Sequence, residues 1–208
     1  MRYLKEQLWL YHPEVDDVFE WQDFSQALMI MDMQSWMLNP YHKKSLPPPI
    51  QKLTERIRDE AKILLENNGI VCVAEYTNRW STVDTIKDVL DRHSKNVIYL
   101  EKECDMLHWK GNSRDKRLKN NRFLSLLREK RIPLELCWVS IRNCIKLSGI
   151  RMYQKGLDIK IPIGLSQDIF NSFLMTSELL EEYWEYSHLL DFWNQGQWEY
   201  LRYVSDYL

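Results

Sequence analysis

The chain has 208 residues, of which 45% are hydrophobic and 28% are charged, which is enough for one domain with a sizeable hydrophobic core. This hydrophobic content, together with a net charge of only −2, excludes an intrinsically disordered chain. We expect neither a membrane span nor a secretory signal, because no apolar run approaches the roughly 18 residues of a span and residues 1–18 contain several charges.

Five short apolar segments, rich in β-branched and long aliphatic residues, predict β-strands. They are residues 27–31, 70–74, 97–100, 134–139 and 159–163. Most of these segments are nearly apolar on both faces, a pattern that is typical of parallel strands covered by helices on each side.

The segments between these strands have apolar residues at three- and four-residue spacing, which predicts amphipathic helices. The predicted helices span residues 49–66, 82–92, 123–129 and 144–154. Because strand and helix alternate, the sequence predicts an α/β fold, a Rossmann-like three-layer α/β/α sandwich with a largely parallel sheet of five or six strands.

A run of basic side chains lies between the third predicted strand and the helix at 123–129. It comprises Lys110, Arg114, Lys116, Arg117, Lys119 and Arg122, interrupted by Asp115. We interpret it as a solvated surface insert, or as a lid whose charge attracts an anionic substrate. We expect no nucleic-acid binding, because the chain as a whole is not basic and carries no nucleic-acid-binding motif.

The end of the chain differs in composition from the rest. Residues 165–208 hold eight acidic residues against one arginine, and eleven of the chain's twenty-six aromatic residues. Several of these aromatics recur at helical spacing, so we expect an acidic, aromatic-rich helical C-terminal extension packed on the body or on a partner subunit. Because a small domain cannot easily hide so much apolar surface, we expect a homo-oligomer, a dimer or a tetramer.

Three chemically active residues follow three of the predicted strands. Asp32 directly follows the first strand, Lys102 follows the third, and Cys144 opens the helix after the fourth. Ligands in open α/β sheets bind at the carboxyl ends of the strands, so these side chains would meet at one edge of the sheet.

The three residue types form a coherent set for nucleophilic catalysis. A cysteine is nucleophilic as the thiolate, and a helix N-terminus and the Lys102 ammonium would both stabilise that anion at Cys144. Asp32 would take the thiol proton as a general base and return it to a leaving amine as a general acid. Taken singly, an aspartate after a strand is also a common helix cap, and a cysteine there is often a small buried hydrophobe.

The four cysteines give a further indication of where the protein acts. Cys72, Cys104, Cys137 and Cys144 form no CxxC pair and no framework of a small secreted protein. We therefore expect free thiols in a reducing compartment, and a cytoplasmic protein.

The ordered set resembles the isochorismatase-like cysteine hydrolases, a family that includes nicotinamidases and carbamoyl-amide hydrolases. Residues 27–34 resemble the family's first strand, which ends in Asp-Met-Gln, and residues 97–102 resemble the strand that ends in its catalytic lysine. Residues 139–145 are similar to its nucleophile motif, which contains Asn-Cys. The resemblance spans residues 25–163, and it identifies residues 1–164 as an isochorismatase-like hydrolase domain.

The resemblance implies a role for each residue of the set. Cys144 would be the nucleophile, Asp32 the acid and base, and Lys102 the ammonium that stabilises the thiolate and the transition state. It also implies a cis peptide bond between Val139 and Ser140, which turns the backbone N–H groups of Ser140 and Cys144 into an oxyanion hole.

The resemblance also bears on metal binding. Nicotinamidases of this family carry an Asp-x-His pair after the second strand that, with a further histidine, binds a divalent cation. Here residues 74–78 read Ala-Glu-Tyr-Thr-Asn, and the five histidines lie scattered along the chain. We therefore expect no metal and no cofactor, and we do not expect nicotinamidase activity.

The function expected from these residues is hydrolysis of a small amide or carbamoyl compound, a C–N bond, through a thioester on Cys144. Gln34, Trp36 and Trp109 are the candidate substrate-binding residues. The nucleophile motif departs from the family pattern, with Trp138 where glycine is usual. An alternative therefore stays open, a catalytically inactive protein of this fold that acts as a partner-binding module.

Overall fold

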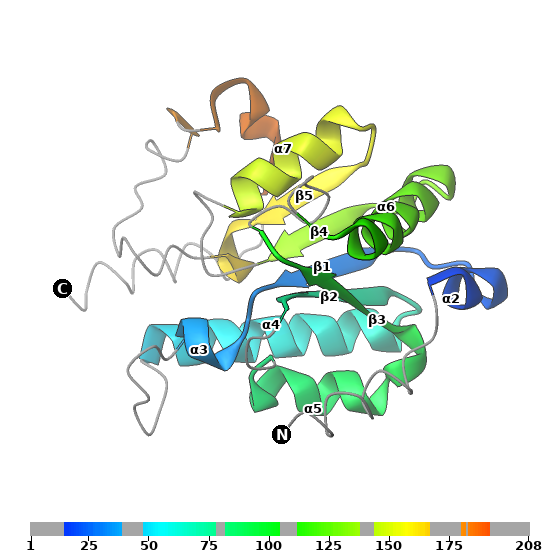
Figure 1. Ribbon diagram of the computed structural model, residues 1–208. Helices are drawn as coiled ribbons and strands as arrows, with labels where there is room; N and C mark the ends of the chain where they lie inside the picture. Colours follow the sequence, from blue (N-terminus) through cyan, green and yellow to red (C-terminus); the bar gives the residue numbers. More distant parts are fainter. Residues whose placement is uncertain are drawn as a thin grey trace.

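A computed structural model describes residues 15–38, 48–77, 82–104, 112–137, 144–166, 180–181 and 183–191. Within these ranges, six strands form one sheet: β1 (Ala27–Met31), β2 (Ile70–Tyr76), β3 (Val97–Lys102), β4 (Leu134–Cys137), β5 (Ile159–Pro162) and β6 (Leu190–Asp191). All neighbouring strands run parallel, in the order β3-β2-β1-β4-β5-β6 (Figure 1). The predicted α/β fold with a largely parallel sheet is therefore confirmed.

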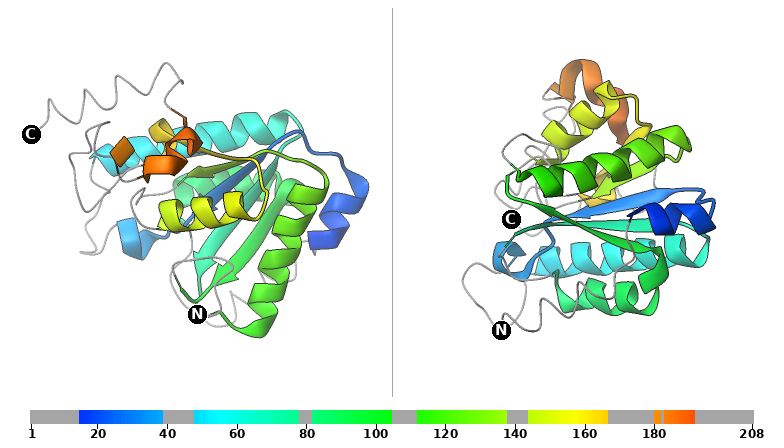
Figure 2. Two further views of the ribbon diagram at one scale, coloured as in Figure 1. Left: turned by 90° about the horizontal axis from the view of Figure 1, so that it is seen from above. Right: turned by 45° about the vertical axis from the view of Figure 1, so that its right-hand side comes forward.

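Helices cover both faces of the sheet. On one face lie α4 (Pro48–Glu66) and α5 (Asp84–Arg92), and on the other lie α6 (Arg114–Glu129) and α7 (Lys146–Gln154), as Figures 1 and 2 show. The shorter elements are α2 (Val15–Trp21), α3 (Ser35–Leu38) and the 3-10 helices η1 (Ser94–Asn96), η3 (Ile163–Leu165) and η4 (Trp184–Leu189). In the described ranges, no helix combines the length and the apolar character needed to cross a bilayer.

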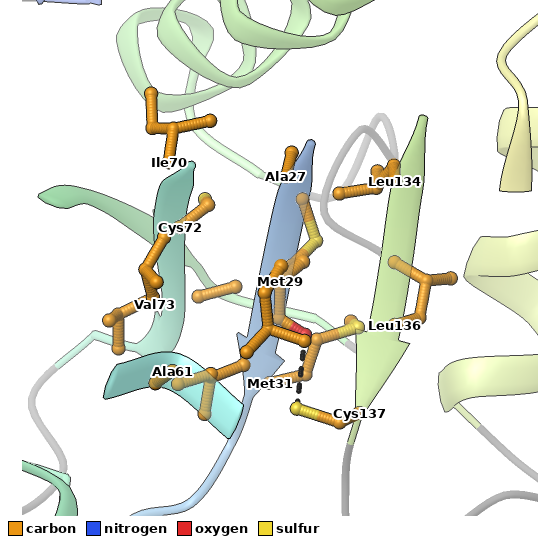
Figure 3. Packing of buried hydrophobic residues seen from close by; sticks show 14 of the residues in the cluster. Ala27, Met29, Met31, Ala61, Ile70, Cys72, Val73, Leu134, Leu136 and Cys137 are labelled. Carbon is orange, nitrogen blue, oxygen red and sulfur yellow. Dashed lines mark hydrogen bonds between the residues drawn. The ribbon is translucent and has the colours of Figure 1, made fainter. Parts of the chain in front are cut away.

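The core lies between the helices and the central strand β1, whose five residues are all fully buried. Figure 3 shows Met29 and Met31 of β1 beside Ala61 of α4 and Val73 of β2. The thiol of Cys137 donates a hydrogen bond to the Met29 carbonyl (3.5 Å), which ties β4 to β1. Burial on both faces explains why these strands are almost continuously apolar in the sequence.

The end of α4 fixes where β2 begins. Asn68 takes a left-handed backbone conformation (φ 60°), and the Gly69 N–H donates to the Leu64 carbonyl at 2.8 Å. A Cβ on Gly69 would lie 2.1 Å from Cδ2 of Leu64, so only glycine allows the chain to turn this closely under the helix.

Helix α6 is longer than predicted, because it begins at Arg114 rather than at Phe123. The apolar periodicity fails in its first half, where Leu118 is 56% exposed while Asn120 is fully buried. The Asn120 side chain donates to the Glu101 carbonyl at 2.9 Å, so an amide occupies a core-facing position of the helix. Most of the basic run therefore lies on a helix, and Lys110 lies outside the described residues.

The described part of the C-terminal segment packs on the body. Its strand β6 extends the sheet, with Leu190 paired to Ile161 of β5. The preceding η4 is a 3-10 helix, and its Tyr186 hydroxyl accepts a hydrogen bond from the Gln154 side chain of α7 at 2.8 Å, while most of the expected helical extension lies outside the described residues. A division of the chain into domains 1–164 and 165–208 stays a prediction.

Candidate functional site

The strand order changes direction at the central strand β1. From β1 the chain builds outward to β2 and β3, whereas β4, β5 and β6 extend the sheet on the other side of β1. The point between β1 and β4 is therefore a topological switch point, and ligands bind outside the carboxyl ends of the strands at such points. Asp32 follows β1 directly, Lys102 is the last residue of β3, and Cys144 follows β4.

The structure joins Asp32 and Lys102 in a buried ion pair. The Lys102 Nζ lies 2.6 Å from Asp32 Oδ2, and both side chains have no exposed surface. Strand β2 lies between their two strands, so the lysine side chain reaches across its end to the carboxylate. Removing an ammonium and a carboxylate from water is costly, and it is tolerated only where the two charges compensate each other.

Asp32 also has a strained backbone. Its φ of 52° lies in the left-handed region, which costs a residue other than glycine about 1–3 kcal/mol. Its N–H donates to the Ala74 carbonyl at 2.9 Å, so the turn out of β1 stays attached to β2. This conformation turns the chain away from the sheet directly after Asp32. Strained backbone conformations of this kind are common in functional sites.

Cys144 lies at the same edge, two residues before α7, and is 3% exposed. Helix α7 runs back along the sheet and ends before Gly156 (φ 83°), ahead of β5. Gly149 lets the helix approach the sheet closely, since a Cβ there would lie 3.1 Å from Ile161 and 3.3 Å from Leu136. The start of the helix therefore places Cys144 near the carboxyl ends of the strands, and a position at a helix N-terminus favours a thiolate.

The other buried cysteines have different surroundings. Cys72 of β2 and Cys137 of β4 are fully buried in the core. Burial raises the pKa of both thiols well above the ordinary value. These two thiols are therefore expected to be inert, whereas Cys144 lies next to a helix start.

The end of β2 adds a residue that the sequence reasoning missed. The ring centroid of Tyr76, the last residue of β2, lies 4.3 Å from the Lys102 Nζ. The Tyr76 N–H donates to Gln34 Oε1 (3.0 Å), and Gln34 Nε2 donates to the Tyr76 carbonyl (3.3 Å). Tyr76 could have been found by applying to β2 the rule used for the other strands, that residues at the carboxyl end line the site.

Gln34 is fully buried, and these two hydrogen bonds tie the loop after β1 to the end of β2. Its role as a substrate-binding residue stays a prediction. Trp36 lies on α3, but the structure does not describe its side chain. Trp109, Ser140 and the expected cis peptide bond after Val139 lie outside the described residues.

The carboxylate of Glu75, near the end of β2, is already engaged in hydrogen bonds. The Glu75 carboxylate accepts hydrogen bonds from the Thr82 N–H (2.7 Å) and from the Thr82 hydroxyl (2.5 Å), so it closes the loop 77–82. In the part of the chain that the structure describes, no three His, Cys, Asp or Glu side chains lie together as a ligand set. The expectation of no metal stays a prediction.

A second charged cluster lies on the opposite side of β3. The Lys116 Nζ of α6 lies 3.2 Å from Glu101 and 2.7 Å from Glu103, and it donates to the Thr77 hydroxyl at 2.6 Å. The hydrogen bond from Lys116 lowers the pKa of Glu103. This member of the basic run therefore anchors α6 to the end of β3.

Asn112 closes the base of the segment between β3 and α6. Its Oδ1 accepts the Glu103 N–H at 2.6 Å, and the Ser113 N–H donates to the Glu103 carboxylate at 2.8 Å. The two ends of residues 103–113 are thereby held together directly after Lys102.

Comparisons with known proteins agree with this geometry at the level of the fold. No protein-family model and no curated protein sequence matches the chain. Among solved structures, the Staphylococcus aureus nicotinamidase SaPncA is similar, with a TM-score of 0.57 and 16% identity over 81% of this chain and 99% of that one. N-carbamoylsarcosine amidase from Thermoplasma acidophilum has a TM-score of 0.57 and 13% identity, covering 81% of this chain and 96% of its own.

A third similar structure carries a different name. The MAR1 ribonuclease from Caenorhabditis elegans has a TM-score of 0.53 and 15% identity, covering 81% of this chain and 75% of its own. At these identities the likeness concerns the arrangement of the backbone. The chain has the fold of the nicotinamidases and of N-carbamoylsarcosine amidase, and the resemblance seen in its sequence is confirmed at that level.

Proposed function

We propose that the protein is a cysteine-dependent hydrolase of a small amide or carbamoyl compound, and that it acts through a thioester intermediate. The observation that carries the proposal is the fully buried ion pair between Asp32 and Lys102 at the switch point of the sheet, with Cys144 following the adjacent strand. A buried ion pair rarely adds stability over an apolar pair, so its presence in the site is better explained by chemistry.

In the proposed first half-reaction, the Asp32 carboxylate takes the proton from the Cys144 thiol. The thiolate then attacks the carbonyl carbon of the substrate and forms a tetrahedral oxyanion. Asp32 gives the proton to the nitrogen, the C–N bond breaks, and ammonia or an amine leaves while Cys144 carries the acyl group as a thioester.

In the second half-reaction, Asp32 takes a proton from water, whose oxygen attacks the thioester carbonyl. The C–S bond breaks, the acid product leaves, and the proton on Asp32 returns to the Cys144 sulfur. The Lys102 ammonium, 2.6 Å from Asp32, keeps the carboxylate charged in its buried position and stabilises the thiolate.

The proposal includes an oxyanion hole formed by the backbone N–H groups of Ser140 and Cys144. Donors of this kind are worth about 2.7–4 kcal/mol each in transition-state stabilisation. It also includes Gln34, Trp36 and Trp109 as residues that contact the substrate.

Two of the structural neighbours support the substrate class, because they are named as a nicotinamidase and as N-carbamoylsarcosine amidase. The Glu75 carboxylate, engaged with Thr82, argues against the metal-dependent recognition of nicotinamide. Small carboxamides and N-carbamoyl compounds are therefore the favoured substrates.

The direct test is a panel of primary amides, N-carbamoyl amino acids and ureas, with ammonia release measured for the wild type, Cys144→Ser and Asp32→Asn. We expect each variant to lose at least about a thousandfold in kcat/KM on any substrate that the wild type hydrolyses. Hydrolysis retained by Cys144→Ser would contradict the mechanism. An empty panel with an unreactive Cys144 would favour the partner-binding alternative.

We further propose that the protein is a cytoplasmic homo-oligomer, a dimer or a tetramer. The support comes from the C-terminal segment, where Trp184 is 77% exposed and Leu180 is 41% exposed. Light scattering coupled to size exclusion should give a multiple of the chain mass, and Trp184→Glu should reduce it. A monomer at all concentrations would contradict this part of the proposal.

A further inference from the structure

We propose that Tyr76 is a positioning residue whose ring holds the Lys102 ammonium in place against Asp32. The inference rests on the proposed function in one respect, because the charge on Lys102 matters for chemistry only where Cys144 is the nucleophile. The contact itself can be tested without any substrate.

The first step of the argument is the surroundings of the ammonium. Lys102 has no exposed surface, so water does not solvate its charge, and its three N–H donors depend on neighbouring groups. Asp32 supplies one oxygen at 2.6 Å, and the Tyr76 ring centroid lies 4.3 Å from the same Nζ. An aromatic face within about 6 Å of an ammonium attracts it, and the attraction is strongest where water is excluded.

The second step is the register of the strands. Tyr76 and Lys102 are paired residues of the parallel strands β2 and β3, so their side chains leave the sheet side by side. Asp32 lies beyond β2, at the end of β1. The lysine side chain must therefore pass Tyr76 to reach the carboxylate, and the ring lies along its path.

The third step is that the backbone of Tyr76 is held in place. Gln34, fully buried, binds both the N–H and the carbonyl of Tyr76. The Thr77 N–H donates to the Lys102 carbonyl at 2.8 Å, which continues the β2–β3 pairing beyond Tyr76. The backbone of Tyr76 is thereby fixed on both sides, toward the β1 loop and toward β3, and this fixes the point from which its ring extends beside Lys102.

A double-mutant cycle on stability tests the contact independently of activity. Tyr76→Leu and Tyr76→Phe are made in the wild type and in an Asp32→Asn/Lys102→Met background, where the site carries no charge. We expect Tyr76→Leu to raise the unfolding equilibrium constant about 3- to 10-fold more in the wild type than in the neutral background. Tyr76→Phe, which keeps the aromatic face, should show no such difference, and equal effects of Tyr76→Leu in both backgrounds would overturn the proposal.

The chemical readout is the alkylation of Cys144 by iodoacetamide as a function of pH, followed by mass spectrometry. Tyr76→Leu should slow alkylation at neutral pH about 3- to 10-fold and move the profile to higher pH, while Tyr76→Phe follows the wild type. A shift of the same size in both variants would mean that the hydroxyl or simple packing is responsible, and would overturn the role of the ring.

The two failures can be told apart. If Asp32→Asn/Lys102→Met leaves the alkylation of Cys144 unchanged, the proposed hydrolase mechanism is wrong, and the stability cycle alone decides whether Tyr76 holds the ammonium. If that background variant slows alkylation while Tyr76→Leu does not, the mechanism stands and the positioning role of Tyr76 is wrong.

Discussion

Near the end of β3, Lys102 of that strand and Lys116 of α6 bind carboxylates in opposite surroundings. Lys102 and Asp32 are completely buried, whereas Lys116 and its partner Glu101 keep 20% and 25% of their side-chain surface exposed. Successive side chains at the end of β3 point to opposite faces of the sheet. Lys102 therefore points toward Asp32, whereas Glu101 and Glu103 point toward Lys116 on the outer side. The comparison teaches that the two ion pairs differ in burial and not in pairing, and burial is the property on which the proposed role of Asp32 and Lys102 depends.

The buried pair should respond most strongly to the loss of one partner. Lys102→Met leaves the Asp32 carboxylate buried without its ammonium, which should lower the free energy of unfolding by about 3–5 kcal/mol. Urea denaturation measures this loss. Asp32→Asn/Lys102→Met should recover most of it, and a single variant within about 1 kcal/mol of the wild type would contradict the account of the pair.

The clamp on Tyr76 should come next in size. Gln34→Leu removes the partners of the Tyr76 N–H and carbonyl, and we expect a loss of about 1–3 kcal/mol in the free energy of unfolding. The matched control is Gln51 on the exposed face of α4. Among its described contacts, the Gln51 side chain donates a hydrogen bond only to Glu55. Gln51→Leu should leave stability within about 0.5 kcal/mol, and equal losses in both variants would argue against the clamp.

The surface cluster should respond weakly and should depend on salt. Lys116→Met should cost less than about 1 kcal/mol, and the difference from the wild type should shrink in high salt. The hydrogen bond from Lys116 lowers the pKa of Glu103, so this contribution is present above the ordinary carboxyl pKa and is lost as the pH falls through the folded-state value. Urea denaturation at several pH values measures this, and an effect that persists at pH 2 would contradict it.

The smallest effect concerns a carboxylate of β4 and has the opposite sign. Burial, followed by the charge of Glu60, raises the pKa of Glu135. A carboxyl whose folded-state pKa is raised opposes folding when it is ionised, so stability is gained as the pH falls through that value. Because Glu135 keeps some solvent access, Glu135→Gln should stabilise the protein at pH 7 by less than about 0.5 kcal/mol, and a loss at pH 7 would contradict this.

The sheet and the meeting of Asp32 with Lys102 were predictable from the sequence for a physical reason. Strands buried on both faces are continuously apolar, so the first polar residue after each one marks the carboxyl edge, as Asp32 does after β1. Lys102 was identified in the same way, as the polar residue that follows an apolar run. In the structure it is the last residue of β3, and a buried strand can include this lysine because Asp32 compensates its charge.

Other features depend on contacts that a single sequence does not display. The start of α6 was missed because Asn120 fills a core-facing position and Leu118 an exposed one, which reverses the usual periodicity. The strand β6 is two residues long and depends entirely on pairing with β5. The position of Tyr76 at the end of β2 could have been read from the sequence, but its contact with the Lys102 ammonium depends on the pairing of β2 with β3.

The central claim is that the buried pair activates Cys144, and pH-resolved alkylation by iodoacetamide tests it most directly. The rates at Cys144, Cys72 and Cys137 are compared in the wild type and in Asp32→Asn/Lys102→Met. The account predicts that Cys144 reacts fast below pH 7 and loses this advantage in the variant, whereas Cys72 and Cys137 stay slow because burial raises their pKa values. If Cys144 in the wild type reacts no faster than these two core thiols, the account is wrong.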